Sequence, residues 1–248
     1  MKYAWPGPVL ILGAGSDIAL AMTRQLAADG YRLQLAARRP EALAGVAEDL
    51  EIRHAAKATI HAFDAQDVAG FEAFWDSLPE EPRIVICAVG MMGDQDASIG
   101  EVDGLQSVIA TNFTGPALFL EIAARRMAQT NEPAAVVGIG SVAGDRGRKL
   151  NYVYGSAKAG FAEYLSGLRQ KHIGGPVHVM TVKPGFVRTA MTADLALPGP
   201  LTSEPEDLAK AVLQSLDKKH FVYYHWKWWL VMAIIKLIPE RIFARLKF

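Results

Sequence analysis

Short apolar segments of strand length alternate along this chain with longer segments that have helical periodicity. A strand buried on both faces is rich in Val, Ile and Leu, and parallel strands need a helical crossover between them. The alternation therefore predicts an α/β fold with a doubly wound, seven-stranded parallel sheet, whose ligands bind at the carboxyl edge of the sheet. The expected strands are residues 9–12, 32–36, 59–63, 84–87, 134–139, 177–182 and 221–224.

Length and composition fit one large domain. The chain has 248 residues, of which 51% are hydrophobic and 21% charged, and two separate cores within this length would each be small. We expect residues 1–224 to form the domain and residues 225–248 to form a helical tail. The formal net charge is zero, and we expect neither a nucleic-acid partner nor a metal site.

The single cysteine and the start of the chain indicate the cellular setting. Cys87 leaves no partner for an internal disulfide, and its place at the end of an apolar strand predicts a buried, unreactive thiol. The residues before Val9 include two prolines and no apolar stretch, so no secretory signal is predicted. A cytoplasmic location is therefore expected.

A glycine-rich turn follows the first expected strand. It reads Gly-Ala-Gly-Ser-Asp-Ile from residue 13 and leads into a helical pattern. Backbone N–H groups and the helix dipole at such a turn attract a pyrophosphate, and glycine lets the backbone approach it closely. An ordinary tight turn is the alternative. The residues assigned to a dinucleotide here are Gly13, Gly15, Ser16, Asp17 and Ile18.

Tyr154 and Lys158 are one helical turn apart, on the same face of an expected helix. A phenol has an ordinary pKa of about 10, and we expect the Lys158 ammonium to lower the pKa of Tyr154 toward the working pH. Ser141, after the fifth expected strand, would donate a second hydrogen bond to the same carbonyl oxygen. Alone, a Tyr–Lys pair also fits a solvated helix face. Its combination with the glycine turn favours catalysis.

These residues, with Asn112 and the segment Lys-Pro-Gly-Phe-Val-Arg-Thr at 183–189, resemble the short-chain dehydrogenase/reductases over nearly the whole chain. The resemblance implies a single-domain Rossmann fold, a nicotinamide dinucleotide and catalysis by Asn112, Ser141, Tyr154 and Lys158. It also implies that Asn112 bends the central helix and holds a water that contacts Lys158. Besides Tyr154 and Lys158 themselves, the further residues that it assigns to the cofactor are Asp64, Ala88, Gly90, Pro184, Gly185, Val187 and Thr189.

Within that assignment, Asp64 meets the adenine and residues 184–189 contact the nicotinamide end. The chain departs from the family pattern in two places. Asp17 and Ala19 stand where the family has its later glycines, and Cys-Ala-Val-Gly at 87–90 replaces Asn-Asn-Ala-Gly.

Two arginines at the end of the second expected strand bear on the choice of cofactor. An acidic residue there would bind the ribose diol of NAD(H), but this chain has Arg38 and Arg39. We expect Arg38 to pair with the 2′-phosphate of NADP(H) and Arg39 to stack on the adenine. The alternatives are NAD(H) as the cofactor, and arginines that only solvate a loop.

A Pro/Gly-rich stretch at residues 197–200 interrupts the segment after Thr189 and predicts a flap over the substrate. Met191, Leu195 and Leu197 would line its apolar entrance, and an ordinary surface loop is the alternative. The next helix is expected to begin near residues 203–206.

The end of the chain is apolar and basic. From residue 218 onward it has seven Lys or Arg residues against Glu240, and residues 226–238 read WKWWLVMAIIKLI. The eight apolar residues between Lys227 and Lys236 are far fewer than the roughly 20 that cross a bilayer. Clustered Trp with flanking cations suits an anionic membrane surface. A helix that packs on the sheet, covers the pocket or forms a subunit contact is the alternative.

Four segments, residues 88–94, 140–148, 151–156 and 238–246, are similar to those of family members that reduce decaprenylphosphoryl-2-keto-ribose in cell-wall synthesis. This narrower resemblance implies a 2-keto sugar joined through phosphate to a polyprenyl chain, and a flavin oxidase partner that makes the ketone. Arg146, Arg148 and Lys149 would then meet the lipid phosphate, or else lie in a solvated loop.

The sequence thus predicts an NADP(H)-dependent reductase of a lipid-linked keto sugar, peripheral to the inner face of the membrane. Two other functions stay open. One is reduction of a free apolar ketone, such as a steroid or a long acyl compound, and the other is a non-catalytic dinucleotide-binding scaffold. The family resemblance further implies a homodimer or homotetramer.

Overall fold

The computed structural model describes residues 5–93 and 102–246. Its central sheet has seven strands in the order β3-β2-β1-β4-β5-β6-β9, and every neighbouring pair is parallel. The predicted α/β fold with a seven-stranded parallel sheet is confirmed, and each strand agrees with its expected range within one residue at either end. The strands are β1 (Val9–Leu12), β2 (Leu33–Ala37), β3 (Ala58–Ala62), β4 (Ile84–Cys87), β5 (Ala134–Ile139), β6 (Val177–Lys183) and β9 (Val222–Tyr224).

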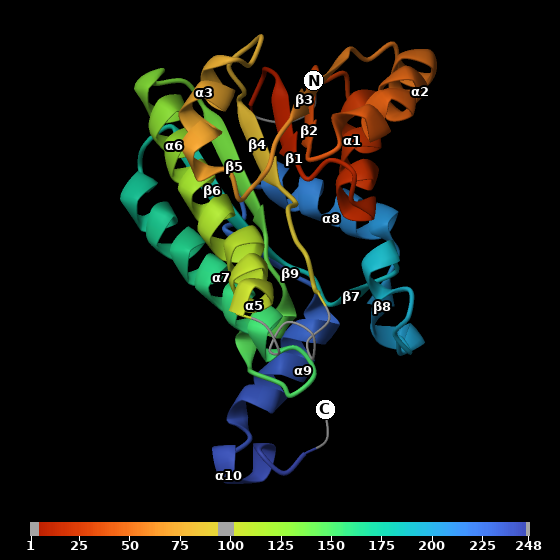
Figure 1. Cartoon of the computed structure of the whole chain (residues 1–248), viewed down its shortest axis with the longest axis vertical. Coiled ribbons are helices and arrows are strands. Elements are labelled where there is room, and N and C mark those ends of the chain that lie inside the picture. The colour runs from red at the N-terminus through yellow and green to blue at the C-terminus, as the bar shows by residue number, and fades with distance from the viewer. Residues whose placement is uncertain (1–4, 94–101, 247–248) are drawn as a thin grey trace.

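Helices cover both faces of the sheet (Figure 1). They are α1 (Asp17–Ala28), α2 (Ala44–His54) and α8 (Pro205–Asp217) on one face, and α3 (Phe71–Asp76), α5 (Val102–Ile109), α6 (Gly115–Gln129) and α7 (Tyr152–His172) on the other. Successive side chains of a strand point to opposite faces, so Val9 and Ile11 of β1 join the core with α1, while Leu10 and Leu12 join the core with α6. All four are fully buried, which explains the continuous apolar run.

The central helix is continuous from α5 through a π-helical turn, Ala110–Thr114, into α6. A π turn has a wider hydrogen-bond ring than an α turn and is frequent at functional sites. By length and composition the segment Val102–Gln129 is apolar enough to cross a bilayer, but 56% of its apolar 18-residue stretch is buried inside the protein. We interpret it as a core helix of the domain.

The order of the strands reverses between β1 and β4, and ligands of such sheets bind in the crevice outside the carboxyl ends at that point. The segments that follow β1, β2, β4, β5 and β6 all meet there. Four 3₁₀ turns lie in these segments: Pro40–Leu43, Val142–Asp145, Ala190–Thr192 and Gly199–Leu201. A fifth, Val68–Gly70, follows β3.

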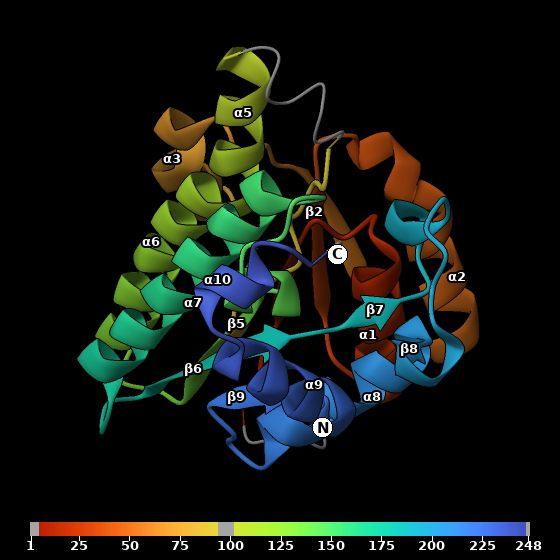
Figure 2. The same ribbon diagram turned by 90° about the horizontal axis from the view of Figure 1, so that it is seen from below.

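After β9 the chain forms α9 (Trp226–Leu237) and α10 (Glu240–Phe243), which lie beyond one end of the sheet (Figures 1 and 2). One side of α9 packs on the domain: Trp228 and Met232 are buried against Val142, beside a short parallel pair of strands, β7 (Phe186–Val187) and β8 (Thr202–Ser203). The opposite side of α9 is exposed.

Candidate active site

The glycine-rich turn after β1 forms one wall of a cleft at the carboxyl edge of the sheet. Gly13 has a φ of +73°, which other residues rarely adopt, and a Cβ there would lie 2.9 Å from the backbone of Ala88. At Gly15, in contrast, a Cβ would have no neighbour within 4 Å. The turn thus packs tightly against the loop after β4 on one side and is open on the other, as a binding site for a pyrophosphate requires.

Helix α1 begins directly at this turn. Ser16 is its N-cap, and the Ser16 Oγ accepts a hydrogen bond from the Ala19 N–H at 3.3 Å. The side chain of Asp17, which the sequence assigns to the cofactor, accepts a hydrogen bond from the Ala190 N–H at 2.7 Å. This contact ties α1 to the segment after β7, while Asp17 itself still lines the cleft. Ile18 lines the cleft.

A cavity of about 310 Å³ extends from the turn toward the end of β2. Arg38 and Arg39 line it, and their exposed side chains have no hydrogen bond or ion pair with the described residues. Asp64 also lines it, and its Oδ1 accepts a hydrogen bond from the Gln66 N–H at 2.9 Å. Two unpaired guanidinium groups make this end of the cleft attractive to an anion.

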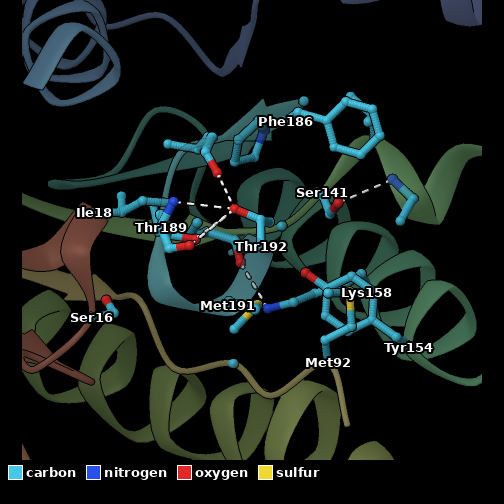
Figure 3. A pocket seen from close by; sticks show the side chains of 18 of the residues that line it. Ser16, Ile18, Met92, Ser141, Tyr154, Lys158, Phe186, Thr189, Met191 and Thr192 are labelled. Atoms are coloured by element: carbon cyan, nitrogen blue, oxygen red, sulfur yellow. Dashed lines mark hydrogen bonds between the residues drawn. The ribbon is translucent and has the colours of Figure 1, made fainter. Parts of the chain in front are cut away.

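A second cavity, of about 360 Å³, shares Gly15, Ser16 and residues 88–90 with the first, so that the two form one continuous cleft. Ser141, which follows β5, lines this cavity together with Tyr154 and Lys158 of α7 (Figure 3). Tyr154 is half-buried at the cavity wall, whereas Lys158 is only 3% exposed. The structure therefore brings together the three groups that the sequence places in catalysis.

Burial dominates the ionisation of Tyr154. It raises the pKa of the phenol above its ordinary value, and a hydrogen bond with Ser141 opposes this shift. The prediction that Lys158 lowers the pKa of Tyr154 is wrong in this arrangement. The Lys158 Nζ lies 5.9 Å from the Tyr154 ring centroid and donates instead to the carbonyl oxygens of Ile139 at 3.0 Å and Val89 at 3.2 Å. Burial lowers the pKa of Lys158 to about 8.

Asn112 lies fully buried in the π turn, where the central helix departs from α geometry as predicted. Its Nδ2 donates to the carbonyl oxygens of Met91 at 2.7 Å and Val108 at 2.8 Å, and its Oδ1 accepts from the Met91 N–H at 3.1 Å. A Cβ on Gly90 would lie 3.4 Å from both the Asn112 Oδ1 and the Lys158 Nζ. The two polar groups therefore flank Gly90, and the expected water between them stays a prediction.

The segment after β6 closes the cleft near Tyr154. A Cβ on Gly185 would lie 1.8 Å from the Trp228 Nε1, so the glycine leaves the space that the indole occupies. The Thr192 Oγ1 donates to the Val187 carbonyl oxygen at 2.6 Å and accepts from the Thr189 N–H at 3.1 Å, which fixes the start of the flap (Figure 3). The residues assigned to the nicotinamide end that line the cavity are Pro184, Gly185, Val187 and Thr189.

The flap agrees with the sequence in part. Met191 and Leu195 line the cavity as expected, whereas Leu197 lies outside its lining. Helix α8 follows the flap and begins at Pro205, with Glu204 as its N-cap, within the predicted range.

Trp228 is a cavity residue that sequence reasoning missed. It is 4% exposed, its Nε1 donates to the Leu201 carbonyl oxygen at 2.8 Å, and its ring meets Phe186 edge-on with the centroids 5.1 Å apart. The sequence predicts a tail that binds a surface, packs on the sheet or covers the pocket, but three tryptophans stand within four residues. No local signal tells which of them enters the cavity.

The three cations after Ser141 have different surroundings. Arg146 does not face the cavity: its guanidinium donates to the carbonyl oxygens of residues 235, 236 and 238 at 2.8–3.2 Å and pairs with Glu240 at 2.7 Å. It therefore caps the end of α9, which corrects its expected role at a lipid phosphate. Lys149 is exposed. Only Arg148 of the three lines the cavity.

Two further predictions concern sulfur and metal chemistry. Cys87 is fully buried, as predicted, and burial raises the pKa of its thiol to about 11, which disfavours the reactive thiolate. Among residues 5–93 and 102–246, no group of three His, Cys, Asp or Glu side chains is arranged to hold a metal ion.

Comparison with known proteins identifies the family. Residues 8–198 match the family model described as short chain dehydrogenase. An uncharacterized oxidoreductase of Mycobacterium tuberculosis is 33% identical over 243 residues, which cover 96% of each chain. The chain is a short-chain dehydrogenase/reductase. Sulfoacetaldehyde reductase 2 of Chromohalobacter salexigens is 31% identical to it over 188 residues, 74% of each chain.

Solved structures of short-chain dehydrogenases share its fold. One from Sphingobium yanoikuyae in complex with NADPH has a TM-score of 0.79 at 23% identity and covers 94% of this chain and 97% of its own. Another, from Burkholderia phymatum in complex with NAD, has a TM-score of 0.79 at 22% identity, with 93% of each chain covered.

This short-chain dehydrogenase/reductase is an NAD(P)-dependent oxidoreductase that acts on CH–OH groups. The cleft fits a dinucleotide, since the open face at Gly15 and the start of α1 suit the pyrophosphate and the arginines suit its adenosine end. When bound, a nicotinamide supplies or accepts the hydride. The chain itself supplies two hydroxyl groups, of Ser141 and Tyr154, and the buried amine of Lys158 to the cavity.

Proposed function

We propose that this protein reduces a ketone, with Tyr154 as the proton donor and Ser141 as a second hydrogen-bond donor to the carbonyl oxygen. The observation that supports this is the pair of hydroxyls on one cavity wall with the buried Lys158 behind them. As negative charge develops on the carbonyl oxygen, the Tyr154 hydroxyl transfers its proton and the Ser141 hydroxyl stabilises the charge. Lys158, with a pKa of about 8, then returns a proton to the Tyr154 oxygen. Asn112 supports the loop after β4, beside Lys158.

We propose NADP(H) as the preferred cofactor, because Arg38 and Arg39 are free to pair with a 2′-phosphate. Arg38→Asp should weaken NADPH binding by about 10–100-fold, since a charge-assisted hydrogen bond contributes about 1.5–3 kcal/mol, and should leave NADH binding nearly unchanged. Fluorescence titration with both cofactors measures the ratio.

Arg32→Asp is the matched control for Arg38→Asp. Arg32 precedes the opposite end of β2 and pairs with Glu80 on the surface at 2.9 Å, where an ion pair contributes little. The control should keep the wild-type preference for NADPH. An unchanged NADPH-to-NADH affinity ratio in Arg38→Asp would count against the phosphate contact.

We propose that the ketone is lipid-linked, with a polyprenylphosphoryl 2-keto sugar as the preferred candidate. Apolar side chains of Met92, Phe186, Met191, Leu195 and Trp228 line the cavity, and the last belongs to the tail. A free apolar ketone such as a steroid or long acyl compound would meet the same walls. The hydrocarbon chain of a long substrate would extend out of the cavity next to α9.

The outer face of α9 supports a peripheral membrane location. The outer face consists of Trp226, Trp229, Leu230, Ile234 and Leu237, which recur at helical spacing, and each is between 49% and 83% exposed. Lys227 and Lys236 belong to the same helix, and Arg241 and Arg245 follow it along the chain. An exposed apolar patch with indoles and cations suits an anionic lipid surface.

Cosedimentation with liposomes tests this location. Wild-type protein should sediment with vesicles of anionic lipid more strongly than with neutral ones, and replacing Trp226 and Trp229 by Asp should abolish the difference while turnover of a soluble ketone is kept. Equal recovery of wild-type protein in the supernatant with both lipids would contradict the proposal. Concentration-dependent dimerisation lost in the double variant would assign the same face to a second copy.

The function itself is tested by incubating the protein with membrane lipid extracts and NADPH deuterated at the transferable hydrogen. The expected result is a lipid that gains one deuterium, found by mass spectrometry and absent with Tyr154→Phe. Deuterium gained only by added steroids or long acyl ketones would favour the free apolar substrate. No reduction of any ketone, with NADPH binding intact, would favour a binding scaffold. The flavin oxidase partner, the homodimer or homotetramer and the cytoplasmic location stay predictions.

A further inference from the structure

Two polar groups of the cavity have no hydrogen-bond partner within the part of the chain that the structure describes. Arg148 and Asn151 both line the cavity that holds Ser141 and Tyr154. The Arg148 Nε and the Asn151 Oδ1 are buried, and neither has a hydrogen-bond partner among residues 5–93 and 102–246. Buried polar atoms are nearly always hydrogen-bonded, and leaving one without a partner is destabilising. The unpaired guanidinium donor and amide acceptor, both at the cavity, therefore indicate that a bound ligand supplies their missing hydrogen-bond partners.

The backbone holds both side chains next to the catalytic helix. The Asn151 N–H donates to the Arg148 carbonyl oxygen at 3.1 Å, and the Asn151 carbonyl oxygen accepts from the Gly155 N–H at 2.7 Å. Asn151 is the N-cap of α7, a position where an Asn side chain usually accepts a hydrogen bond from the first turn of the helix. Its side chain makes no such bond here. The amide is thus available to the cavity, close along the chain to Tyr154.

The charge of Arg148 is also uncompensated. No carboxylate of the described residues pairs with it, and burial lowers the pKa of its guanidinium, which nevertheless stays protonated at neutral pH. Asp17, a carboxylate that lines the same cavity, is hydrogen-bonded to Ala190. A partly buried cation without a counter-ion is unfavourable unless an anion enters beside it.

We propose that Arg148 and Asn151 form a subsite for the anionic, oxygen-rich head of an otherwise apolar substrate. Arg148 binds a phosphate group through its planar fork of N–H donors, and Asn151 accepts a hydrogen bond from a neighbouring hydroxyl. The apolar walls at Phe186 and Trp228 hold the hydrocarbon part. The subsite adds the substrate class to the proposed function. It rests on that function only for the claim that the bound ligand is the ketone that is reduced.

Binding measured without turnover tests the subsite. Octyl phosphate, 1-octanol and inorganic phosphate are titrated calorimetrically into the wild-type protein with NADP⁺ bound. Octyl phosphate should bind at least about tenfold more tightly than either of the others, because it alone supplies both the anion and the apolar chain; tenfold corresponds to about 1.4 kcal/mol. Equal affinities for octyl phosphate and 1-octanol would overturn the proposal. Equal affinities for octyl phosphate and inorganic phosphate would overturn the claim that the apolar walls bind the hydrocarbon part of the ligand.

Three variants locate the anion. Arg148→Met should lower the affinity for octyl phosphate to that of 1-octanol, and Arg148→Lys, which keeps the charge but loses the fork, should retain part of the preference. Lys149→Met, at the exposed neighbouring position, should bind like wild type. An Arg148→Met protein that keeps the preference, or one that loses NADPH affinity to the same degree, would overturn the assignment to substrate.

The two proposals fail separately. If octyl phosphate is preferred but no ketone is reduced, the subsite stands and the reductase function is wrong. If ketones are reduced but wild-type protein shows no preference for the phosphate, the reductase stands and the subsite is wrong.

Discussion

Tyr154→Phe should lower turnover by about 10²–10⁴-fold, the contribution that a positioned general acid typically makes, while NADPH binding stays nearly unchanged. The substitution removes only the phenol oxygen and keeps the ring in place on α7, so the fold and the cofactor end of the cleft are preserved. Without the hydroxyl, the developing oxyanion retains the Ser141 hydrogen bond but has no adjacent proton donor. Single-turnover oxidation of NADPH with a saturating ketone measures the loss.

Tyr152→Phe is the matched control for this result. Tyr152 lies two residues earlier on the same helix, its side chain is 43% exposed, and the Ser156 hydroxyl bonds its backbone carbonyl instead of its phenol. This variant should turn over like wild type. A Tyr154→Phe protein that keeps more than about a tenth of wild-type turnover would exclude Tyr154 as the essential acid.

Trp228→Ala should release the tail from the domain. The indole is buried, fills the space above Gly185 and donates to Leu201, and truncating a buried Trp costs about 3–5 kcal/mol. We expect this loss to appear as local opening of α9, which makes Lys227 and Lys236 accessible to trypsin and removes one wall of the substrate cavity. Limited proteolysis followed by mass spectrometry detects the release, and denaturant unfolding measures what remains.

Trp229→Ala removes the neighbouring indole, which is 60% exposed, and should change stability by no more than about 0.5 kcal/mol. Its tail should resist trypsin as the wild-type tail does. Equal protection of the tail in Trp228→Ala and Trp229→Ala would show that Met232 and the cap at Arg146 hold α9 without the indole.

The amino-acid sequence by itself determined the sheet and the gathering of Ser141, Tyr154 and Lys158 at its edge. Each central strand is buried on both faces, so its continuous apolar run can be recognised in the sequence without knowing which strands lie beside it. All strands of a parallel sheet end at the same edge, and a residue that follows a strand is therefore placed in space by its place in the chain. Gly13 is recognisable for the same reason, as a turn between strand and helix.

Only the tertiary structure decided which of several similar side chains serve the site. Arg146 and Arg148 are two residues apart, yet one caps α9 and the other borders the cavity, because the carbonyl groups that bind Arg146 come from residues about 90 positions further along the chain. Trp228 and Trp229 differ in the same way. The pKa of Tyr154 rises for a related reason: burial depends on every element packed around the phenol, whereas the sequence shows only the charge one turn away.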